Sequence, residues 1–460
     1  MKKLFVPFLI LFLFQGCDKK KDPVPEGAND HVDSWIYDNM QFWYYWASAL
    51  PASPDKSQGP EPFFKSLLSP DDRFSWIQEN FTDLLNSLRG VSKEAGFEFA
   101  LYRTSESSNT LIMQILYIKP NSPAENAGLK RGDVVSAING TELQIANYED
   151  LLKEMSQNFT MSYRPVDPDA QTTGESKDIS IVPVEYAEDP NFMHTVFNSN
   201  DRIIGYYVYN LFSEGPDENS TQYIDEMADI FSEFKSAGIT DLILDLRYNS
   251  GGAVSAAQHL ASFIAPNITS SSVFLKYEYN ENVTERIKDD PSLGEQSLIL
   301  PFLVKSQNIG SQLRDNRVYI LTGPRTASAS ELIINGLRPF MDVFLIGDVT
   351  VGKNVGSISL YDETDPNNKW GMQPIVMKFY NKDDQSDYAA GFNPQISAPE
   401  NSAYLKALGD ENEKLLSAAI QQIANGSVAR EAEPAELGEL ILHSLDLKKR
   451  SGIVTVDLPF

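Results

Sequence analysis

Residues 202–347 alternate between strand-like and helix-like segments, and this alternation constrains the fold more than any other feature of the sequence. Short apolar runs suit buried strands, whereas longer amphipathic segments suit helices. A chain that alternates in this way packs helices against a sheet. We therefore expect an α/β layer structure. Strands are expected at 202–212, 241–246, 318–322 and 343–347, and helices at 221–237, 253–264 and 328–337.

A serine stands where the strand at 318–322 leads into the helix at 328–337. Residues 326–331 read Thr-Ala-Ser-Ala-Ser-Glu, which places Ser328 at the helix start. Free backbone N–H groups and the helix dipole favour negative charge there, so the position suits attack on a carbonyl and stabilisation of the oxyanion. The alternative is a plain helix cap, for which serine is also preferred. Lys353, 25 residues later, is a candidate base for Ser328.

A glycine pair follows another expected strand. Residues 245–252 read Asp-Leu-Arg-Tyr-Asn-Ser-Gly-Gly, between the strand at 241–246 and the helix at 253–264. Paired glycines let backbone N–H groups face a ligand without an intervening Cβ atom. A nucleotide P-loop is disfavoured because no Lys-Ser/Thr follows the glycines. Asp245 and Arg247 are expected to hold this loop through an ion pair.

The segment 118–140 has a strongly ordered set of turn and helix signals. Pro123 can occupy an early helical position where its missing N–H costs nothing, and Gly128 can end that short helix. An alternating strand at 134–138 then leads into the tight turn Asn139-Gly140. This block resembles a PDZ domain, which we place at residues 93–187.

The three core motifs together resemble the C-terminal processing peptidases, or tail-specific proteases, over residues 31–425. The resemblance implies a multidomain α/β protein with an N-terminal helical module, a PDZ domain and a crotonase-like α/β protease core. It implies a serine endopeptidase in which Ser328 is the nucleophile and Lys353 the general base. Gly251 or Gly252, with the N–H of Ala329, would form the oxyanion hole. The small and apolar neighbours of Lys353 would desolvate its amine and lower its pKa.

One position departs from this family. A glutamine that orients the lysine is usual four residues after it, and here that position is Ser357. A serine hydroxyl can bond the amine over a shorter reach, and Gln373 or Asn354 are alternatives. The departure is the only support for a rival hypothesis, a catalytically inactive PDZ and crotonase-like binding scaffold. A histidine-based triad is the rival chemistry, with candidates at His31, His194, His259 and His443.

The PDZ resemblance implies protein or peptide partners with apolar C-termini. Such a domain adds an extended peptide to a sheet edge and captures its carboxylate on backbone N–H groups. The capturing loop would be Gly96-Phe97-Glu98-Phe99, and the groove helix would span 148–155. Phe97, Phe99 and Leu151 would line the pocket for the last side chain, although they also suit a plain domain core. In the family the PDZ domain also gates access to the active site.

The N-terminus has the pattern of a bacterial lipoprotein signal. Lys2-Lys3 precedes an apolar run at 4–14 that is too short to span a bilayer, and Cys17, the only cysteine, follows Gly16. We expect export to the bacterial cell envelope, cleavage after residue 16 and a membrane anchor through lipid on Cys17. The polar segment 17–30 would be a tether. Aromatic residues in 31–92 predict a small helical module, or else an interface for a homodimer or for docking on the protease body.

Composition sets further limits. The net charge of −26 argues against nucleic acid as a partner. No His-Glu-x-x-His motif or cysteine pair suggests a metal site, and no cofactor is expected. The tail after Gly426, rich in alanine and glutamate, is expected to form a surface helix. The predicted division is a signal peptide at 1–16, a tether at 17–30, a helical module at 31–92, a PDZ domain at 93–187, a peptidase core at 188–430 and a tail at 431–460.

Overall fold

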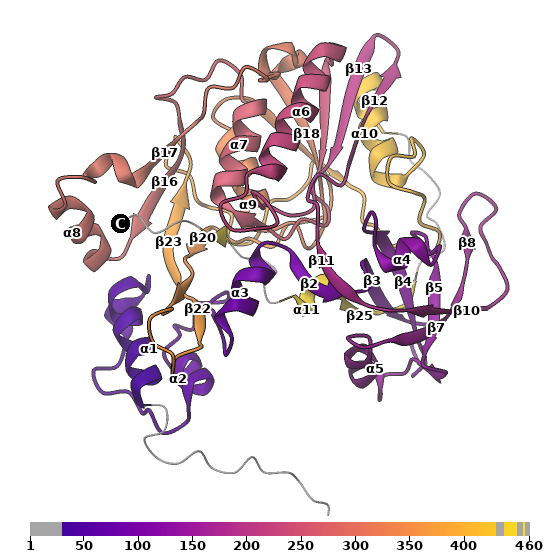
Figure 1. The fold of residues 1–460 in the computed structure, drawn as a ribbon. Coiled ribbons are helices and arrows are strands. Elements are labelled where there is room, and N and C mark those ends of the chain that lie inside the picture. Colours follow the sequence, from indigo (N-terminus) through magenta and orange to yellow (C-terminus); the bar gives the residue numbers. More distant parts are fainter. Residues whose placement is uncertain (1–29, 429–436, 449–453, 456–460) are drawn as a thin grey trace, which may run out of the picture.

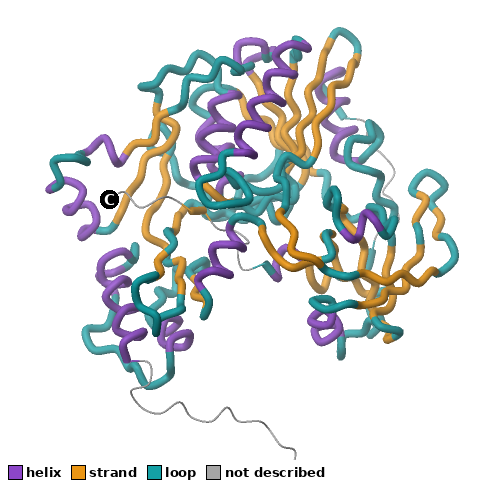
Figure 2. The backbone as a smooth tube through the Cα atoms, in the orientation of Figure 1, coloured by secondary structure: helices purple, strands orange, loops and turns teal. Residues whose placement is uncertain are grey.

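The computed structural model describes residues 30–428, 437–448 and 454–455 (Figure 1). An α/β body lies at the top of Figure 1, the PDZ-like strands lie at its lower right, and the N-terminal helices lie at its lower left. Figure 2 shows that helices gather on the body while the PDZ-like part consists mainly of strands. The expected signal peptide, the tether and Cys17 lie outside the described residues. No helix within the described ranges is long and apolar enough to cross a membrane.

The body is built on one sheet with helices on both faces, as the strand–helix alternation predicts. Strands β13, β14, β18 and β19 run parallel, and β12 joins β13 as an antiparallel edge. Leu244 and Ile320 face a core shared with α7 and α9, whereas Ile243 and Leu321 face a core shared with α10. The elements are β12 Met193–Ser199, β13 Arg202–Val208, β14 Asp241–Asp245, β18 Arg317–Thr322, β19 Asp342–Gly347, β24 Ile396–Ser397, α6 Gln222–Ala237, α7 Val254–Ile264, α9 Ala329–Leu337 and α10 Lys414–Asn425.

The body has a second sheet, which contains the last residue of the 245–252 motif and the residues that follow Lys353. Its order is β15-β26-β20-β23-β16-β17, and helix α8 packs against β16. Strand β15 begins at Gly252, and β20 follows Lys353 by two residues. The elements are β15 Gly252–Ala253, β26 Val454–Thr455, β20 Val355–Ser357, β23 Ile375–Tyr380, β16 Val273–Tyr279, β17 Ile299–Pro301 and α8 Glu281–Asp289.

The PDZ domain is a sheet of order β10-β7-β5-β4-β3-β25 with two short helices. Ser122 caps α4 by accepting a hydrogen bond from the N–H of Glu125, and Pro123 is the first helical residue, as the sequence predicts. The elements are β3 Phe97–Arg103, β4 Leu111–Ile118, α4 Pro123–Asn126, β5 Val134–Ile138, β6 Thr141–Glu142, α5 Tyr148–Glu154, β7 Phe159–Arg164, β10 Lys177–Ile181 and β25 Leu440–His443, with the hairpin β8 Val166–Asp167 and β9 Thr172–Thr173 and the linking pair β2 Val91–Glu94 and β11 Val184–Ala187.

The N-terminal module shares its core with the body. Ile36, Tyr44 and Phe64 belong to the same buried cluster as the helices over the central sheet. Strand β1 pairs with β22 of the body, so the module is joined to the body by backbone as well as by packing. The predicted domain boundaries stay predictions. The elements are α1 Asp30–Trp43, α2 Pro60–Ser66, β1 Trp76–Gln78, α3 Phe81–Leu88, β21 Leu360–Tyr361 and β22 Gly371–Gln373.

The C-terminal tail differs from the expected surface helix. Its described part forms strand β25, the one-turn helix α11 (Ser444–Leu447) and strand β26. The strands pair with the PDZ domain and with the body. Their residues, Leu-Ile-Leu-His and Val-Thr, are mostly apolar or β-branched and suit strands. The alanine- and glutamate-rich residues 429–436 lie outside the described ranges. The surface-helix prediction is therefore wrong for the described residues of the tail.

Candidate active site

The predicted site residues meet where β14, β18 and β19 end. Carboxyl ends of parallel strands share one edge of a sheet, which is where α/β proteins place their ligands. The three turns are tied together there. Thr326 donates its hydroxyl to the carbonyl of Leu246 at 2.7 Å, and the N–H of Val351 donates to the carbonyl of Thr326 at 3.0 Å. Ser328, Lys353 and the glycine pair thus come from three turns that hydrogen-bond to one another.

Ser328 lies fully buried in a backbone conformation that serine rarely adopts. Its φ and ψ are 65° and −116°, directly before α9. Such a conformation costs on the order of 1–3 kcal/mol and needs the surrounding structure to maintain it. Ser328 and Glu331 have the arrangement of a capping box at the start of α9, but the hydroxyl Oγ makes no hydrogen bond of normal length and angle. The backbone thus holds Ser328 in place and leaves its hydroxyl available to another partner.

Lys353 is buried without a counter-ion at its amine. Its side chain is 0 % exposed, and Nζ has no hydrogen-bond partner. The nearest feature is the ring of Phe74, whose centroid lies 4.9 Å from Nζ. Burial lowers the pKa of Lys353 to about 7, against the opposing pull of the carboxylates of Asp72 and Glu331. Near pH 7 the Lys353 amine is therefore neutral in a large share of the molecules, and a general base must be neutral to accept a proton.

Glu331 holds the two candidate catalytic turns together. Its Oε2 accepts hydrogen bonds of 2.8 Å from the N–H groups of Ser328 and Lys353. Its Oε1 accepts from the N–H of Gly352 at 2.7 Å and from the hydroxyl of Thr350 at 2.6 Å. Burial raises the pKa of Glu331, and the four donors oppose that shift by stabilising the carboxylate. This residue fixes the backbone of the serine turn relative to that of the lysine turn.

The predicted oxyanion residues lie beside the serine turn. Ala329 is the first residue of α9, where N–H groups have no acceptor within the helix. The N–H of Gly251 donates to the side-chain oxygen of Asn249 at 2.9 Å. Gly252 has a φ of 138°, and a Cβ atom there would lie 2.1 Å from the carbonyl oxygen of Phe212. Only glycine fits this close approach, so one of the paired glycines is required by the packing of the loop.

The candidates for orienting the lysine do not hydrogen-bond to its amine. Ser357 is buried in β20 opposite Ile375. The amide of Asn354 donates to the carbonyl of Ser386 at 2.7 Å, and the Nε2 of Gln373 donates to the hydroxyl of Ser359. Because Nζ of Lys353 has no hydrogen-bond partner among the described residues, the packing around Phe74 positions the lysine in this conformation.

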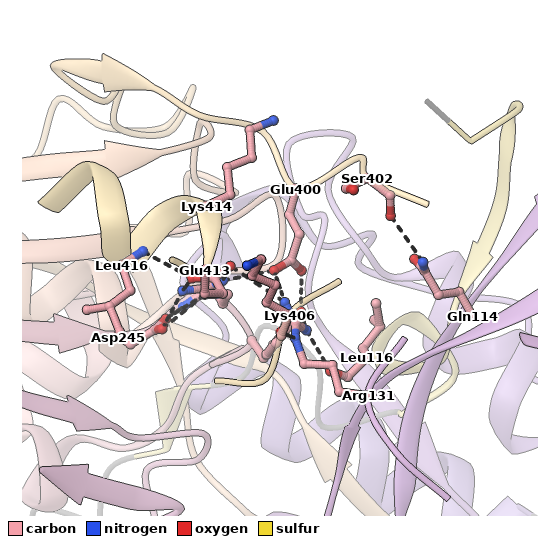
Figure 3. Close-up of polar contacts among 12 residues, drawn as sticks. Gln114, Leu116, Arg131, Asp245, Glu400, Ser402, Lys406, Glu413, Lys414 and Leu416 are labelled. Atoms are coloured by element: carbon pink, nitrogen blue, oxygen red, sulfur yellow. Dashed lines mark hydrogen bonds and ion pairs between the residues drawn. The ribbon is translucent and has the colours of Figure 1, made fainter. Parts of the chain in front are cut away.

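The motif at 245–252 also contains a buried ion-pair cluster that reaches the PDZ domain. Arg247 pairs with Asp245 at 2.8 Å, as the sequence predicts, and with Glu413 at 2.6 Å. Glu400 contacts both Arg247 and Arg131, and Arg131 belongs to the PDZ domain. Figure 3 shows Arg131, Glu400, Glu413 and Asp245 converging on this cluster. The candidate oxyanion loop and the PDZ domain are therefore linked through buried charges.

The predicted PDZ residues surround the beginning of β3. Gly96 has a φ of 86°, and Phe97, Phe99 and Leu151 are buried in the domain core. Glu98 is also buried and pairs with Lys119 at 3.1 Å. The structure brings the loop and the groove helix to one region, as the resemblance implies. It also shows the C-terminal strand β25 on the edge of β3.

A pocket of about 520 Å³ adjoins the serine turn. It is bounded by the N-terminal module, by residues next to Ser328 and Lys353, and by the C-terminal segment. Representative lining residues are Phe74, Arg325, Ala327, Val351, Asp446 and Lys448. The pocket is a candidate site for substrate side chains next to the scissile bond.

The histidines have other partners or positions. His194 bonds Glu233 at 2.9 Å, His259 bonds Lys305 at 3.0 Å, and His443 accepts from the N–H of Leu445 at 3.1 Å. His31 lies near Asn367. None of them bonds Ser328, whose hydroxyl has no partner within the described ranges. The same part of the chain contains no cluster of side chains that could hold a metal ion.

Two contributors to the site came from a part of the chain where we predicted only packing or an interface. Phe74 covers the amine of Lys353, and Asp72 is the largest influence that raises the lysine pKa. Both belong to the sequence Asp-Arg-Phe-Ser at 72–75, within the predicted N-terminal helical module. Glu331 was visible in the serine motif, but its contacts with the lysine turn depend on tertiary structure. The spacing of residues along the sequence does not indicate which distant turn a side chain contacts.

Comparison with known proteins matches this architecture in all three parts. A model of peptidase family S41 matches residues 203–398, a model of the S41 N-terminal domain matches residues 31–76, and a PDZ-domain model matches residues 114–161. These stretches lie within the α/β body, the N-terminal module and the PDZ sheet. The chain belongs to peptidase family S41.

Similar proteins include named processing proteases. The chain is 24% identical to carboxy-terminal processing protease CtpB of Bacillus subtilis over 70% of this chain and 61% of that protein. It is 23% identical to a carboxyl-terminal-processing protease of Picosynechococcus over 67% of this chain and 66% of that protein. The chain thus spans less than two thirds of the length of these two relatives. A crystal structure described as an S41 protease of Bacteroides fragilis superposes with a TM-score of 0.70 and 27% identity, over 86% of this chain and 98% of that one.

Proposed function

We propose that this protein is a serine endopeptidase that hydrolyses peptide bonds with Ser328 and Lys353. The observation that carries the proposal is the pair of buried, unpartnered groups, one hydroxyl and one amine, on turns held together by Glu331. Burying a polar group without a partner is costly, so a native structure that retains two such groups at one site favours a functional reason.

Each chemical step follows from what these groups can do. Neutral Lys353 takes the hydroxyl proton as Ser328 Oγ attacks the carbonyl carbon, because serine alone is a poor nucleophile. The tetrahedral oxyanion accepts hydrogen bonds from backbone N–H groups, for which Ala329 and the Gly251–Gly252 loop are candidates. The lysine ammonium then protonates the leaving amine, and the acyl-enzyme remains on Ser328. Water attacks the acyl group with Lys353 as base, which releases the carboxylate and restores the serine.

The PDZ domain supports recruitment of substrates by an apolar C-terminus. Phe97 and Phe99 at the start of β3 share one buried cluster with Leu151 of helix α5, and a strand and a helix of this kind form the peptide groove of a PDZ domain. The curated relatives are named for carboxyl-terminal processing, which is consistent with this substrate class. Deleting residues 93–187 is expected to reduce cleavage of tailed proteins far more than that of short peptides, and equal effects would count against recruitment and gating.

The proposed location is the bacterial cell envelope. It is supported by the basic, apolar and cysteine-containing pattern at residues 2–17, which predicts a lipid anchor on Cys17. Metabolic labelling with a fatty acid tests it: the wild type should incorporate label in a bacterial host, and Cys17→Ala should not. Label in neither protein would remove the lipid anchor from the proposal.

The activity is tested with an unstructured protein that ends in an apolar tail. Wild type is expected to cleave it, whereas Ser328→Ala and Lys353→Ala should lose cleavage by at least about a thousandfold. A fluorophosphonate probe gives a second readout, because labelling that disappears in Ser328→Ala identifies the reactive serine. A folded wild type that neither cleaves nor labels would favour the inactive scaffold.

A further inference from the structure

The C-terminal segment lies on the edge of the PDZ domain where a peptide ligand would add. Strand β25 pairs antiparallel with β3, with Leu440 opposite Tyr102 and His443 opposite Ala100. It runs toward the loop at 96–99, which is the direction a bound C-terminus takes when it is captured there. The N–H of Phe99 donates to the hydroxyl of Ser444 at 2.9 Å, so this segment uses a backbone donor of the capturing loop.

Side chains of this segment also occupy the groove. Ile441 and Leu442 pack against the cluster that contains Phe97, Phe99 and Leu151, the three residues predicted to hold a ligand side chain. Polar contacts hold the end of the segment in place. Ser444 donates to Glu98 at 2.6 Å, and Lys448 bonds the same carboxylate.

The same segment reaches the turn that carries the nucleophile. Arg325, three residues before Ser328, pairs with Asp446 of α11 at 2.6 Å. Asp446 and Lys448 form part of the wall of the 520 Å³ pocket beside the serine turn. A peptide that follows β25 is therefore directed from the PDZ edge into the candidate active site.

Farther along the chain, strand β26 lies between the two motifs that flank the candidate catalytic groups. Val454 and Thr455 pair in parallel with Gly252 and Ala253 on one side, and Thr455 pairs with Ser357 on the other. Neighbouring strands lie about 4.8 Å apart, so β15 and β20 stand about 10 Å apart with room for a single extended chain. The candidate oxyanion loop leads into one border of this slot, and the segment after Lys353 forms the other.

We propose that the C-terminal segment, through β25 and β26, is a built-in pseudosubstrate that occupies both the PDZ edge and the single-strand slot beside Ser328. This inference rests on the proposed peptidase function. The segment is an added strand at both places, the form in which a PDZ domain binds an extended peptide. A protein substrate with an extended apolar C-terminus displaces it, first from β3 and then from the slot.

The main test uses the full chain with substitutions at β26. Val454→Pro with Thr455→Pro removes both backbone N–H groups and with them the ladder bonds. The matched control, Val454→Thr with Thr455→Val, keeps both N–H groups. The proline variant is expected to hydrolyse a short unstructured fluorogenic peptide about tenfold faster than wild type, as when a segment that blocks nine-tenths of the molecules is released. The control variant should match wild type.

A second test measures binding and does not depend on catalysis. A chain that ends at residue 436 and carries Ser328→Ala is mixed with a labelled peptide of residues 437–460, and fluorescence anisotropy reports binding. Saturable binding, weakened at least tenfold by Leu442→Glu in the peptide and unchanged by Leu447→Glu, is expected, because Leu442 packs in the groove and Leu447 is 54% exposed. Circular dichroism verifies that the shortened chain is folded.

The outcomes separate the two proposals. Equal peptide hydrolysis by the proline variant, its control and wild type would overturn the pseudosubstrate, and so would a folded shortened chain that does not bind the peptide. Failure of the peptidase function has a different signature: no variant cleaves or reacts with a fluorophosphonate, although binding of the 437–460 peptide is still measurable.

Discussion

At the scale of the residue, the proposed chemistry depends on the protonation state of the Lys353 amine. Lys353 is buried under Phe74, and its pKa is lowered to about 7. Activity is expected to fall about tenfold per pH unit below 7 and to level off above it, because only the neutral amine accepts the serine proton. The pH dependence of kcat/KM measures this. A profile that is flat from pH 5.5 to 9 would exclude Lys353 as the base.

Asp72 is expected to adjust that profile. Its carboxylate favours the charged lysine, so Asp72→Asn should lower the lysine pKa and shift the pH profile of kcat/KM toward lower pH. Asparagine keeps an oxygen to accept the 2.9 Å bonds from the N–H groups of Phe74 and Ser75. Asp71→Asn, at an exposed neighbour, is the control and should leave the profile in place. A shift toward higher pH would contradict the electrostatic role.

Burial of the Lys353 amine should also lower the free energy of unfolding. The folded pKa of Lys353 lies below its usual value of 10.5, so the unfolded chain binds the additional proton between pH 7 and 10.5, and stability rises with pH in that window. Lys353→Met is therefore expected to raise the free energy of unfolding by roughly 2 kcal/mol or more at pH 6, with a smaller gain at pH 9. Urea unfolding at the two pH values measures both quantities. A variant less stable than wild type at pH 6 would refute this account.

At the scale of the element, the site depends on turns that follow separate strands. Glu331 on α9 accepts from the turn before that helix and from the turn after β19, so one carboxylate sets their separation. Glu331→Gln replaces an acceptor oxygen by a donor amide. It is expected to lower kcat at least about a hundredfold with little change in KM, because a misplaced nucleophile affects the reaction more than substrate binding. Glu285→Gln, on the exposed face of α8, is the control, and a Glu331→Gln enzyme with normal kcat would disprove this positioning role.

At the scale of the whole molecule, buried charges connect the PDZ domain with the candidate oxyanion loop. Arg131 donates to Tyr248, which belongs to that loop, at 2.6 Å, and it also pairs with Glu400. Arg131→Met would leave Glu400 with Arg247 as its remaining charged partner and with the hydroxyl of Tyr248 as a donor, at an expected cost of about 2–4 kcal/mol in unfolding free energy. The exposed neighbour Lys130→Met should cost less than about 0.5 kcal/mol. Chemical denaturation of both variants measures the difference. Equal free energies of unfolding would show that the contacts of Arg131 do not contribute to stability.

The sequence predicts the body well where local and tertiary preferences agree. Strand β14, helix α6 and helix α9 lie within one or two residues of their predicted bounds. The reason is that buried strands and amphipathic helices leave a periodic pattern along the chain. The prediction was wrong for the described tail, whose strands form only because β3, β15 and β20 offer edges to pair with.

The sequence by itself determined the class of fold and the serine, lysine and glycine-pair motifs, because each depends on local chemistry or on periodicity. Tertiary structure alone decided which groups surround the lysine. Phe74, Asp72 and Glu331 reach the site from distant or separate segments, and the C-terminal tail lies against both the PDZ domain and the body. The pKa of a buried amine depends on everything packed around it in three dimensions, and spacing along a chain does not contain that information.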